Sequence, residues 1–312
     1  MDIDRNFFAD EDNSELLMKL PLLFERFKSG GLGRKPRILQ PPKLECAVRI
    51  PYGPFQFKVS LEGEFAYEIE ATTNLKNWET ILCGSAIDKT DFLDSQASKF
   101  SYRFYRLKTG QVYSANIIGY VTVTLPPAFS MIANPLKSED TRVMALFKGM
   151  PDHTKLSKFD AQSHRLGENS VEHRKWSDPI ETLMPGEGAL IFNPTSDYKS
   201  VSFVGDVMQG EILVPIPAGF SIRSSTLPLP GRLDTDLAFP IGDGDVVHLF
   251  DRDKQAYVLY PFEHGGWIAG PPVIGAGESF WVAKKSGGNW VTNYRPPETR
   301  TEHTVLKSDN KN

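Results

Sequence analysis

Two stretches of this sequence lie 91 residues apart and carry the same residues in the same order. "LPPAFSMIAN" (125–134) and "IPAGFSIRSS" (216–225) share a proline, a phenylalanine and a serine. At the same offset, without gaps, further identities fall on glycine, phenylalanine, tryptophan and aspartate, residue types that specify turns and cores. This concentration predicts a tandem duplication of one β scaffold, with repeats at 113–203 and 204–294.

Two repeats are too few to stack into a solenoid, so they predict either two similar β domains or one pseudo-symmetric β domain. The first repeat opens with "YVTVTL", whose alternation is typical of a strand with one buried face. Later segments of the two repeats predict hairpins that turn at Asp160 and Asp251, where a carboxylate can bond the turn backbone. If one repeat has acquired a binding role, we expect it where the residues after the shared Phe-Ser differ, at "MIAN" and "IRSS".

The composition agrees with an all-β chain. The 312 residues include 25 glycines, 23 prolines and 20 phenylalanines, which favour strands and turns, and the length favours two or three domains. The net charge of −4 gives no support for nucleic-acid binding, and no apolar run is long enough to span a membrane. We therefore expect several β-sandwich-like modules, preceded by an N-terminal amphipathic helix and a linker.

The segment 14–29 has apolar residues at helical spacing, ends at "GG", and should be kinked by Pro21. Its apolar face comprises Leu16, Leu20, Leu23, Phe24 and Phe27. This face either packs on its own domain or docks into a groove of a protein partner. A proline-rich linker follows, to residue 43.

The first fifteen residues are acidic and lack the basic start and apolar core of a signal peptide. We therefore expect synthesis in the cytoplasm, followed by export through another route or incorporation into a particle.

A third pattern lies between the linker and the repeats. The strings "YEIEATTNLKNWETI" and "DFLDSQASKFSYRFYRL" contain Thr73, Asn74, Leu75, Trp78, Phe92, Asp94 and Phe104–Leu107 in characteristic order. About residues 46–109 resemble a short immunoglobulin-like or fibronectin-like β-sandwich module of bacterial surface and extracellular proteins. The resemblance implies a spacer or interaction module. Residues 113–294 likewise resemble paired repeats that accompany this module in such proteins.

The predicted organisation has five parts. They are a helical docking segment with linker (1–43), the sandwich module (44–112), the two repeats (113–203 and 204–294) and a flexible tail (295–312). Cys46 and Cys83 both fall on strands of the sandwich module, either bridged as a disulfide or kept as buried thiols.

A Glu-His-x-x-Trp motif occurs in both repeats, at Glu172, His173 and Trp176 and again at Glu263, His264 and Trp267. A carboxylate beside an imidazole is a candidate metal site. Adjacent residues of a strand point to opposite faces, however, so we interpret the tryptophan as structural and the Glu-His pair as surface.

Acidic residues at "GDGD" and "DRD" offer a weak calcium site near Asp243 and Asp245, although we interpret them as turn residues in preference. No nucleophile elbow, phosphate-binding loop or zinc spacing occurs. We therefore expect no cofactor and no catalytic residue.

Our first hypothesis is a non-enzymatic structural and interaction protein, tethered through its N-terminal segment to a surface layer, a filament or a phage-like particle. Its partner is then another protein or further copies of the chain. The alternative is a carbohydrate-binding adhesion protein that presents Tyr260, Trp267 and Trp290 to a glycan. A minority alternative is a hydrolase whose residues converge from distant positions.

Overall fold

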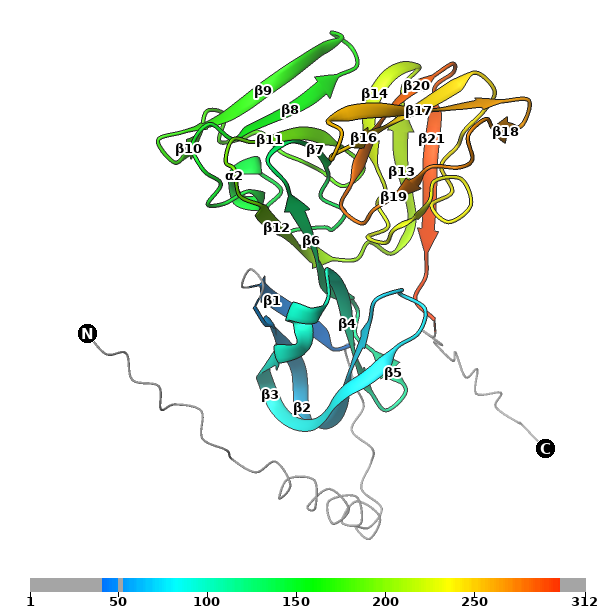
Figure 1. Cartoon of the computed structure of the whole chain (residues 1–312). Helices are drawn as coiled ribbons and strands as arrows, with labels where there is room; N and C mark the ends of the chain where they lie inside the picture. The colour runs from blue at the N-terminus through cyan, green and yellow to red at the C-terminus, as the bar shows by residue number, and fades with distance from the viewer. Residues whose placement is uncertain (1–40, 50–52, 298–312) are drawn as a thin grey trace, which may run out of the picture. The chain divides into compact units, whose positions relative to one another are not determined.

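Antiparallel β-strands make up most of the chain that is described by the computed structural model, residues 41–49 and 53–297 (Figure 1). The all-β prediction is therefore confirmed. The predicted N-terminal helix, with Leu16, Leu20, Leu23, Phe24 and Phe27, lies outside the described residues. Most of the predicted tail lies outside them too.

A seven-stranded sheet begins the described chain and has the order β1-β2-β4-β6-β12, with β3 beside β2 and β5 beside β4. Its strands are β1 (Lys43–Arg49), β2 (Phe55–Thr72), β3 (Glu79–Asp94), β4 (Tyr102–Thr109), β5 (Val112–Tyr113), β6 (Ile118–Leu125) and β12 (Lys199–Asp206). A short 3-10 helix, η1 (Ser95–Lys99), joins β3 to β4. Because β6 pairs with both β4 and β12, one sheet links the predicted sandwich module to the first repeat.

Strand β6 contributes to two hydrophobic cores. Ile118 and Tyr120 pack with the aromatic residues of β2 and β4, while Val121, Val123 and Leu125 belong to the core of the first repeat. Successive side chains of a strand point to opposite faces, so its alternation supplies both cores. "YVTVTL" does form the predicted strand, and the tyrosine at its start lies in the neighbouring core.

Two of the residues that carry the sandwich resemblance, Asn74 and Asp94, hold a turn and a helix cap. Asn74 Oδ1 accepts hydrogen bonds from the backbone N–H groups of Lys76 and Asn77, at 2.9 and 2.8 Å. Asp94 caps η1 and accepts hydrogen bonds from Arg103 and from the Tyr105 hydroxyl. The arrangement, mostly strands in several sheets, is compatible with a β-sandwich.

Each repeat contains a five-stranded sheet, and the two sheets have the same strand order. The first is β10-β9-β8-β11-β7 and the second is β18-β17-β16-β20-β14. The first sheet comprises β7 (Ala128–Ile132), β8 (Lys155–Asp160), β9 (Arg165–Glu172), β10 (Lys175–Trp176) and β11 (Ala189–Asn193). The second comprises β14 (Gly219–Ser224), β16 (Asp245–Asp251), β17 (Ala256–Glu263), β18 (Gly266–Trp267) and β20 (Ser279–Lys284). Matched strands begin 90 or 91 residues apart.

The remaining elements extend this correspondence. β13 (Gly210–Ile216) pairs with β21 (Gly288–Tyr294), as β6 pairs with β12 in the first repeat. The first repeat also contains the one-turn helix α2 (Val143–Leu146), and the second repeat has a turn at the equivalent place. This turn lies beside two short paired strands, β15 (Gly231–Arg232) and β19 (Val273–Ile274). Strand β12 continues to Asp206, across the predicted junction at 203/204.

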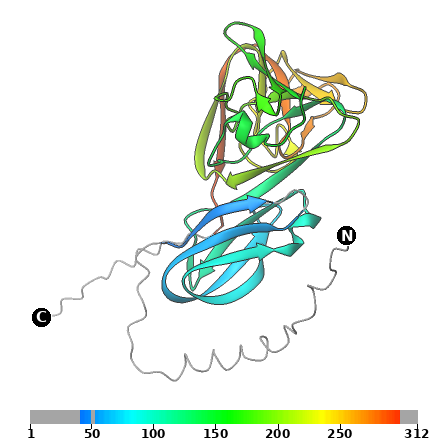
Figure 2. The same ribbon diagram turned by 90° about the vertical axis from the view of Figure 1, so that its left-hand side faces the viewer.

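The two repeats contact each other through equivalent groups. The backbone N–H of Ala133 donates to the Gly277 carbonyl at 2.9 Å. The backbone N–H of Ser224 donates to the Gly186 carbonyl at 3.2 Å. Both donors and both acceptors are related by the same 91-residue offset. The first repeat donates in one bond and the second repeat donates in the other, so the two bonds define a pseudo-two-fold relation between the repeats. The strands of the two repeats lie against one another in Figure 2.

Position 188 meets its own equivalent, position 279. A Cβ atom added to Gly188 would collide with the side chains of Ser279 and Ile222. A residue that touches its own equivalent lies on the symmetry axis, so Gly188 and Ser279 mark where that axis passes.

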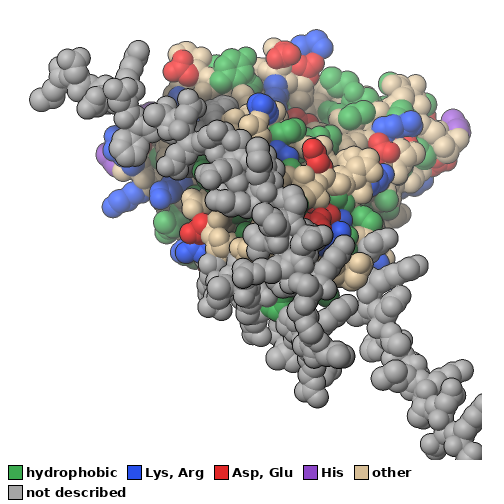
Figure 3. Space-filling model, turned by 90° about the horizontal axis from the view of Figure 1, so that it is seen from below, with side chains coloured by type: hydrophobic (Ala, Val, Ile, Leu, Met, Phe, Trp, Pro, Cys, Tyr) green, Lys and Arg blue, Asp and Glu red, His purple; other side chains and the backbone are tan. Residues whose placement is uncertain are grey.

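The surface of the described residues is mixed in character. Figure 3 shows acidic and basic side chains interspersed on one face. No helix of the described part is long and apolar enough to cross a membrane. Cys83 is a free, exposed thiol on β3, so the expected buried thiol is wrong at this position. The side chain of Cys46 lies outside the description.

Candidate functional site

The Glu-His pairs lie at hairpin turns rather than within strands. Glu172 is the last residue of β9, and His173 and Arg174 form a two-residue turn with φ values of 52° and 63°. His264 begins the matching turn in the second repeat, followed by a glycine. Two positive φ values are typical of a type I′ hairpin turn. The expectation that the pair occupies adjacent strand positions is corrected accordingly.

An aspartate holds each of these turns. Asp152 Oδ1 accepts a hydrogen bond from Arg174 N at 2.7 Å, and Asp243 Oδ1 accepts one from Gly265 N at 2.8 Å. Glu187 and Glu278 similarly accept bonds from backbone N–H groups three residues before them, both at 2.9 Å. These matched carboxylates therefore stabilise the scaffold in both repeats.

Both carboxylates of the weak calcium prediction are engaged by protein donors. Asp243 holds the turn at Gly265, as described above. The buried Asp245 accepts hydrogen bonds from Gly242 N and Lys285 N and forms an ion pair with Lys284. Across the described residues, no three His, Cys, Asp or Glu side chains gather in a group suited to a metal ion.

The three aromatic residues expected to face a glycan do not form one exposed surface. Trp290 is 1% exposed and donates its Nε1–H to the Leu237 carbonyl at 2.7 Å, so its ring belongs to the core. Tyr260 and Trp267 are partly buried and pack against the same core. Trp267 donates its Nε1–H to Asp234 at 2.9 Å.

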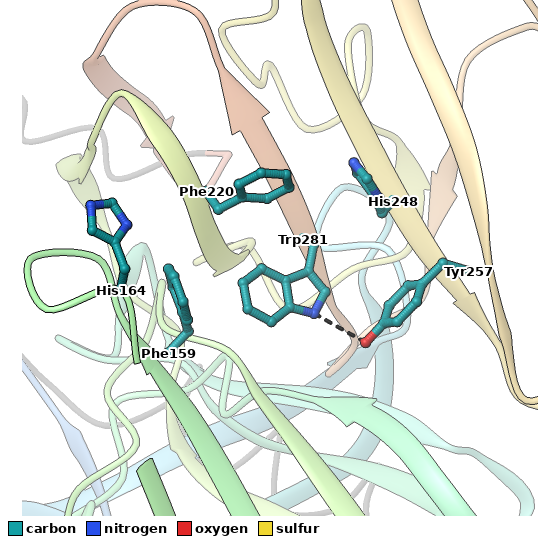
Figure 4. Close-up of a pocket in the computed structure, with 6 residues that line it drawn as sticks. All are labelled: Phe159, His164, Phe220, His248, Tyr257 and Trp281. Atoms are coloured by element: carbon teal, nitrogen blue, oxygen red, sulfur yellow. Dashed lines mark hydrogen bonds between the residues drawn. The ribbon is translucent and has the colours of Figure 1, made fainter. Parts of the chain in front are cut away.

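A different group of aromatic residues forms an open pocket at the contact between the repeats. The pocket, which we call the Trp281 pocket, has a volume of about 450 Å³ and is lined by Phe159, His164, Phe220, His248, Tyr257 and Trp281 (Figure 4). Phe159 and His164 come from the β8–β9 hairpin of the first repeat, and the others from the sheet of the second. In Figure 4 the Trp281 indole lies between Phe159 and Tyr257.

Strand alternation places these side chains on one face of the second sheet. In β20, Phe280 and Val282 enter the core, so Trp281 points to the opposite face. Trp281 lies directly across from His248 in the register of β16 and β20. Tyr260, by contrast, pairs with the buried Val247 and therefore belongs to the core face.

The rings of the pocket are held edge to face. Phe159 lies 4.8 Å from Trp281 between ring centroids, and Phe220 lies 5.8 Å from His248. Trp281 donates its Nε1–H to the Tyr257 hydroxyl at 3.1 Å, which uses its single donor. Phe220 and Tyr257 remain 48% and 39% exposed, so ring surface stays open to solvent.

Burial favours the uncharged forms of two polar groups of the pocket, His248 and Tyr257. Burial lowers the pKa of His248, which favours the neutral imidazole, and burial raises the pKa of Tyr257, which favours the protonated phenol. None of the six lining residues is Lys, Arg, Asp or Glu.

The equivalent place in the first repeat is arranged differently. Phe129, the counterpart of Phe220, is 41% exposed and packs at a tilt against Phe192, with ring centroids 4.9 Å apart. Its backbone is bonded on both sides by the Gln255 side chain, whose Oε1 accepts from Phe129 N at 2.9 Å and whose Nε2 donates to Phe129 O at 3.0 Å. His164 is the equivalent of Gln255, and Ala283 is the equivalent of Phe192.

A second cleft, which we call the Trp176 cleft, lies in the first repeat and has a volume of about 1070 Å³. Its floor includes Phe147 and Trp176, which meet edge to face at 6.1 Å. Lys148, Arg174 and Lys175 also line it, with one acidic residue, Asp152, and give it a rim with an excess of basic side chains, called the basic rim. The second repeat has glycines at the positions equivalent to Arg174 and Lys175, so this rim is specific to the first repeat.

The sequence interpretation missed the Trp281 pocket, although it contained a signal. Aligning the repeats shows Trp281, Tyr257 and His248 in place of Leu190, Leu166 and Ser157. Attention to the segment "IRSS" was only partly useful. Phe220 lies just before it, but Ile222, Ser224 and Ser225 are buried, and Ser224 bonds the first repeat.

No protein-family model matches the chain, and no curated protein matches it either.

Proposed function

We propose that the protein is a non-enzymatic structural and interaction protein, whose β modules join a larger assembly through the N-terminal segment 1–43. The observation that supports this best is the Trp176 cleft, where an aromatic floor lies beside a basic rim. Tryptophan, methionine and arginine are enriched in protein interfaces, and all three line this cleft. A protein segment that carries both acidic and apolar side chains fits its chemistry.

We also infer that about residues 46–109 are an immunoglobulin-like or fibronectin-like module and that 113–203 and 204–294 arose by duplication. The matched strand orders and the repeated Asp152 and Asp243 bonds support the duplication. The turn-forming roles of Asn74 and Asp94 support the module. Such modules act as spacers that carry binding surfaces.

Truncation before the first strand tests the tethering role. Because β1 begins at Lys43 and Pro42 accepts a hydrogen bond from Ala115 N at 2.8 Å, the cut belongs after Gln40. We expect chain 41–312 to keep the melting temperature of the full chain to within a few degrees, while it leaves the assembly. Native mass measurement in lysates of its own host provides the readout. A truncated chain that stays in a particle of unchanged mass would contradict the proposal.

The cleft is tested in the full chain by Lys175→Glu, which reverses one charge of the basic rim. We expect at least a tenfold loss of partner retention, because an acidic segment would then meet a like charge. Lys285→Glu, an exposed charge reversal in the second repeat, is the matched control and should retain the partner. If both variants retained the partner equally, the Trp176 cleft would not be its binding site.

A further inference from the structure

The Trp281 pocket is a product of divergence between two matched scaffolds. Three of its residues, Trp281, Tyr257 and His248, replace two leucines and a serine of the first repeat. A fourth difference, Ala283 in place of Phe192, removes the ring on which Phe220 would otherwise stack. The backbone pairing of β14 with β20 nevertheless matches that of β7 with β11.

Divergence also removes the side chain that bonds the backbone at the first site. Gln255 joins both polar backbone atoms of Phe129, whereas its equivalent His164 makes no comparable bond to Phe220 among the described residues. His164 is instead exposed at the rim of the pocket, beside Phe159. The same scaffold therefore gives a backbone contact held by glutamine in one repeat and an open aromatic pocket in the other.

The lining restricts the ligand by its charge. No acidic side chain lines the pocket to balance a bound cation, and no lysine or arginine lines it to hold an anion. Aromatic faces attract apolar C–H surface, and the cavity volume is within the range of small-ligand pockets. The ligand should therefore be neutral, with at least one flat apolar face.

The polar groups restrict the ligand further. A neutral imidazole offers one N–H donor and one nitrogen acceptor, and a phenol both donates and accepts. His164, His248 and the Tyr257 hydroxyl together offer both kinds of group around the Trp281 indole. A proline-rich peptide brings carbonyl acceptors but few donors, whereas each hydroxyl of a sugar supplies both.

We propose that the Trp281 pocket binds a neutral pyranose, whose C–H face lies against the indole of Trp281 and whose hydroxyls bond His164, His248 and Tyr257. This binding site goes beyond the proposed assembly function and does not depend on it. Its residues are separate from the aromatic residues Tyr260, Trp267 and Trp290 considered from sequence.

The test uses the full chain and isothermal titration with neutral hexose oligosaccharides: cellohexaose, laminarihexaose, mannohexaose and galactohexaose. We expect at least one to bind with a dissociation constant at or below about 1 mM. Trp281→Leu, which restores the residue of the first repeat, should weaken that binding at least tenfold. His248→Ser, a second restoration, should weaken it severalfold. Trp267→Leu changes an aromatic residue on the core face and should leave binding within twofold.

Far-ultraviolet circular dichroism and melting curves accompany each variant. A wild-type chain that binds none of the four sugars overturns the proposal, as does sugar binding that both Trp281→Leu and His248→Ser leave unchanged while folded. Two further probes, tetramethylammonium and a proline decamer, identify competing chemistries. If the wild-type chain bound either of these probes more tightly than the sugars, that result would also overturn the proposal. Truncation after Gln40 should leave sugar affinity unchanged, which separates this result from the assembly test.

Discussion

At Phe129 of the first repeat, the Gln255 side chain bonds both backbone polar atoms; at Phe220 of the second repeat, His164 is the equivalent of Gln255 and an aromatic pocket is present. The basic rim of the Trp176 cleft, in contrast, occurs in the first repeat, since Arg174 and Lys175 correspond to glycines in the second. Meanwhile the carboxylates that hold the turns are the same in both. The comparison teaches that the bonds that hold the turns are common to both repeats, while the two matched surfaces have diverged separately.

The largest expected effect concerns an ion pair that only the second repeat contains. Lys284 and Asp245 are both buried, and their equivalents in the first repeat are Asn193 and Thr154. Lys284→Met should lower the free energy of unfolding by about 3–5 kcal/mol, because it leaves a buried carboxylate without its cation. Urea denaturation measures the change.

Two further variants sharpen the measurement on this ion pair. Lys254→Met breaks a surface pair with Asp251 and should leave the free energy of unfolding almost unchanged, because solvent screens exposed ion pairs. The double variant Asp245→Thr with Lys284→Asn, which installs the residues of the first repeat, should recover much of the loss. If Lys284→Met unfolded at the same urea concentration as Lys254→Met, the pair would have no special role.

The next effect concerns the glycines at the contact between the repeats. Gly277 has a φ of 76°, and a Cβ atom there would lie 2.7 Å from Val123 Cγ2. Gly277→Ala should therefore lower the free energy of unfolding by about 2–4 kcal/mol, through backbone strain and overpacking together. Gly186→Ala, which meets Val214 at the same distance, should cost a similar amount.

Gly210→Ala provides the control for this effect, since Gly210 has a φ of 82° but open space around its Cα. Strain alone should cost about 1–2 kcal/mol there. Thermal melts of the three variants separate strain from crowding. Equal losses in all three would show that the two repeats do not press on each other at these positions.

The smallest expected effect lies in the turns beside the Trp176 cleft. Arg174 has a φ of 63°, whereas its equivalent is Gly265, for which such a φ carries little cost. Arg174→Gly should raise the free energy of unfolding by less than about 1 kcal/mol, and Gly265→Arg should lower it by a similar amount. Chemical denaturation of both variants provides the check, and a shift of the same sign in both would be inconsistent with the turn geometry.

The parts of the fold that depend on local pattern were predictable. Alternation identified β6, and the hairpins at Asp160 and Asp251 follow from apolar periodicity interrupted by a turn residue. Both aspartates accept a backbone hydrogen bond two residues ahead, as their position predicts.

The features that depend on distant pairing were not predictable. Nothing near Trp290 in the sequence shows that Leu237 accepts its N–H, so its burial was missed. The approach of Phe159 to Trp281 depends on how the two repeats pack, and local periodicity has no information about that packing. His173 was misplaced because a two-residue turn is shorter than the window in which alternation can be recognised.

Strand β6 has a consequence for how this chain loses its structure. Ile118 and Tyr120 lie in one core and Val121, Val123 and Leu125 lie in the next, so opening either core disturbs a strand that carries apolar side chains of the other. Local opening that would be inexpensive in separately linked domains therefore becomes costly here. The sandwich module and the first repeat should share a single cooperative unit of unfolding, and slow amide exchange along β6 would protect both.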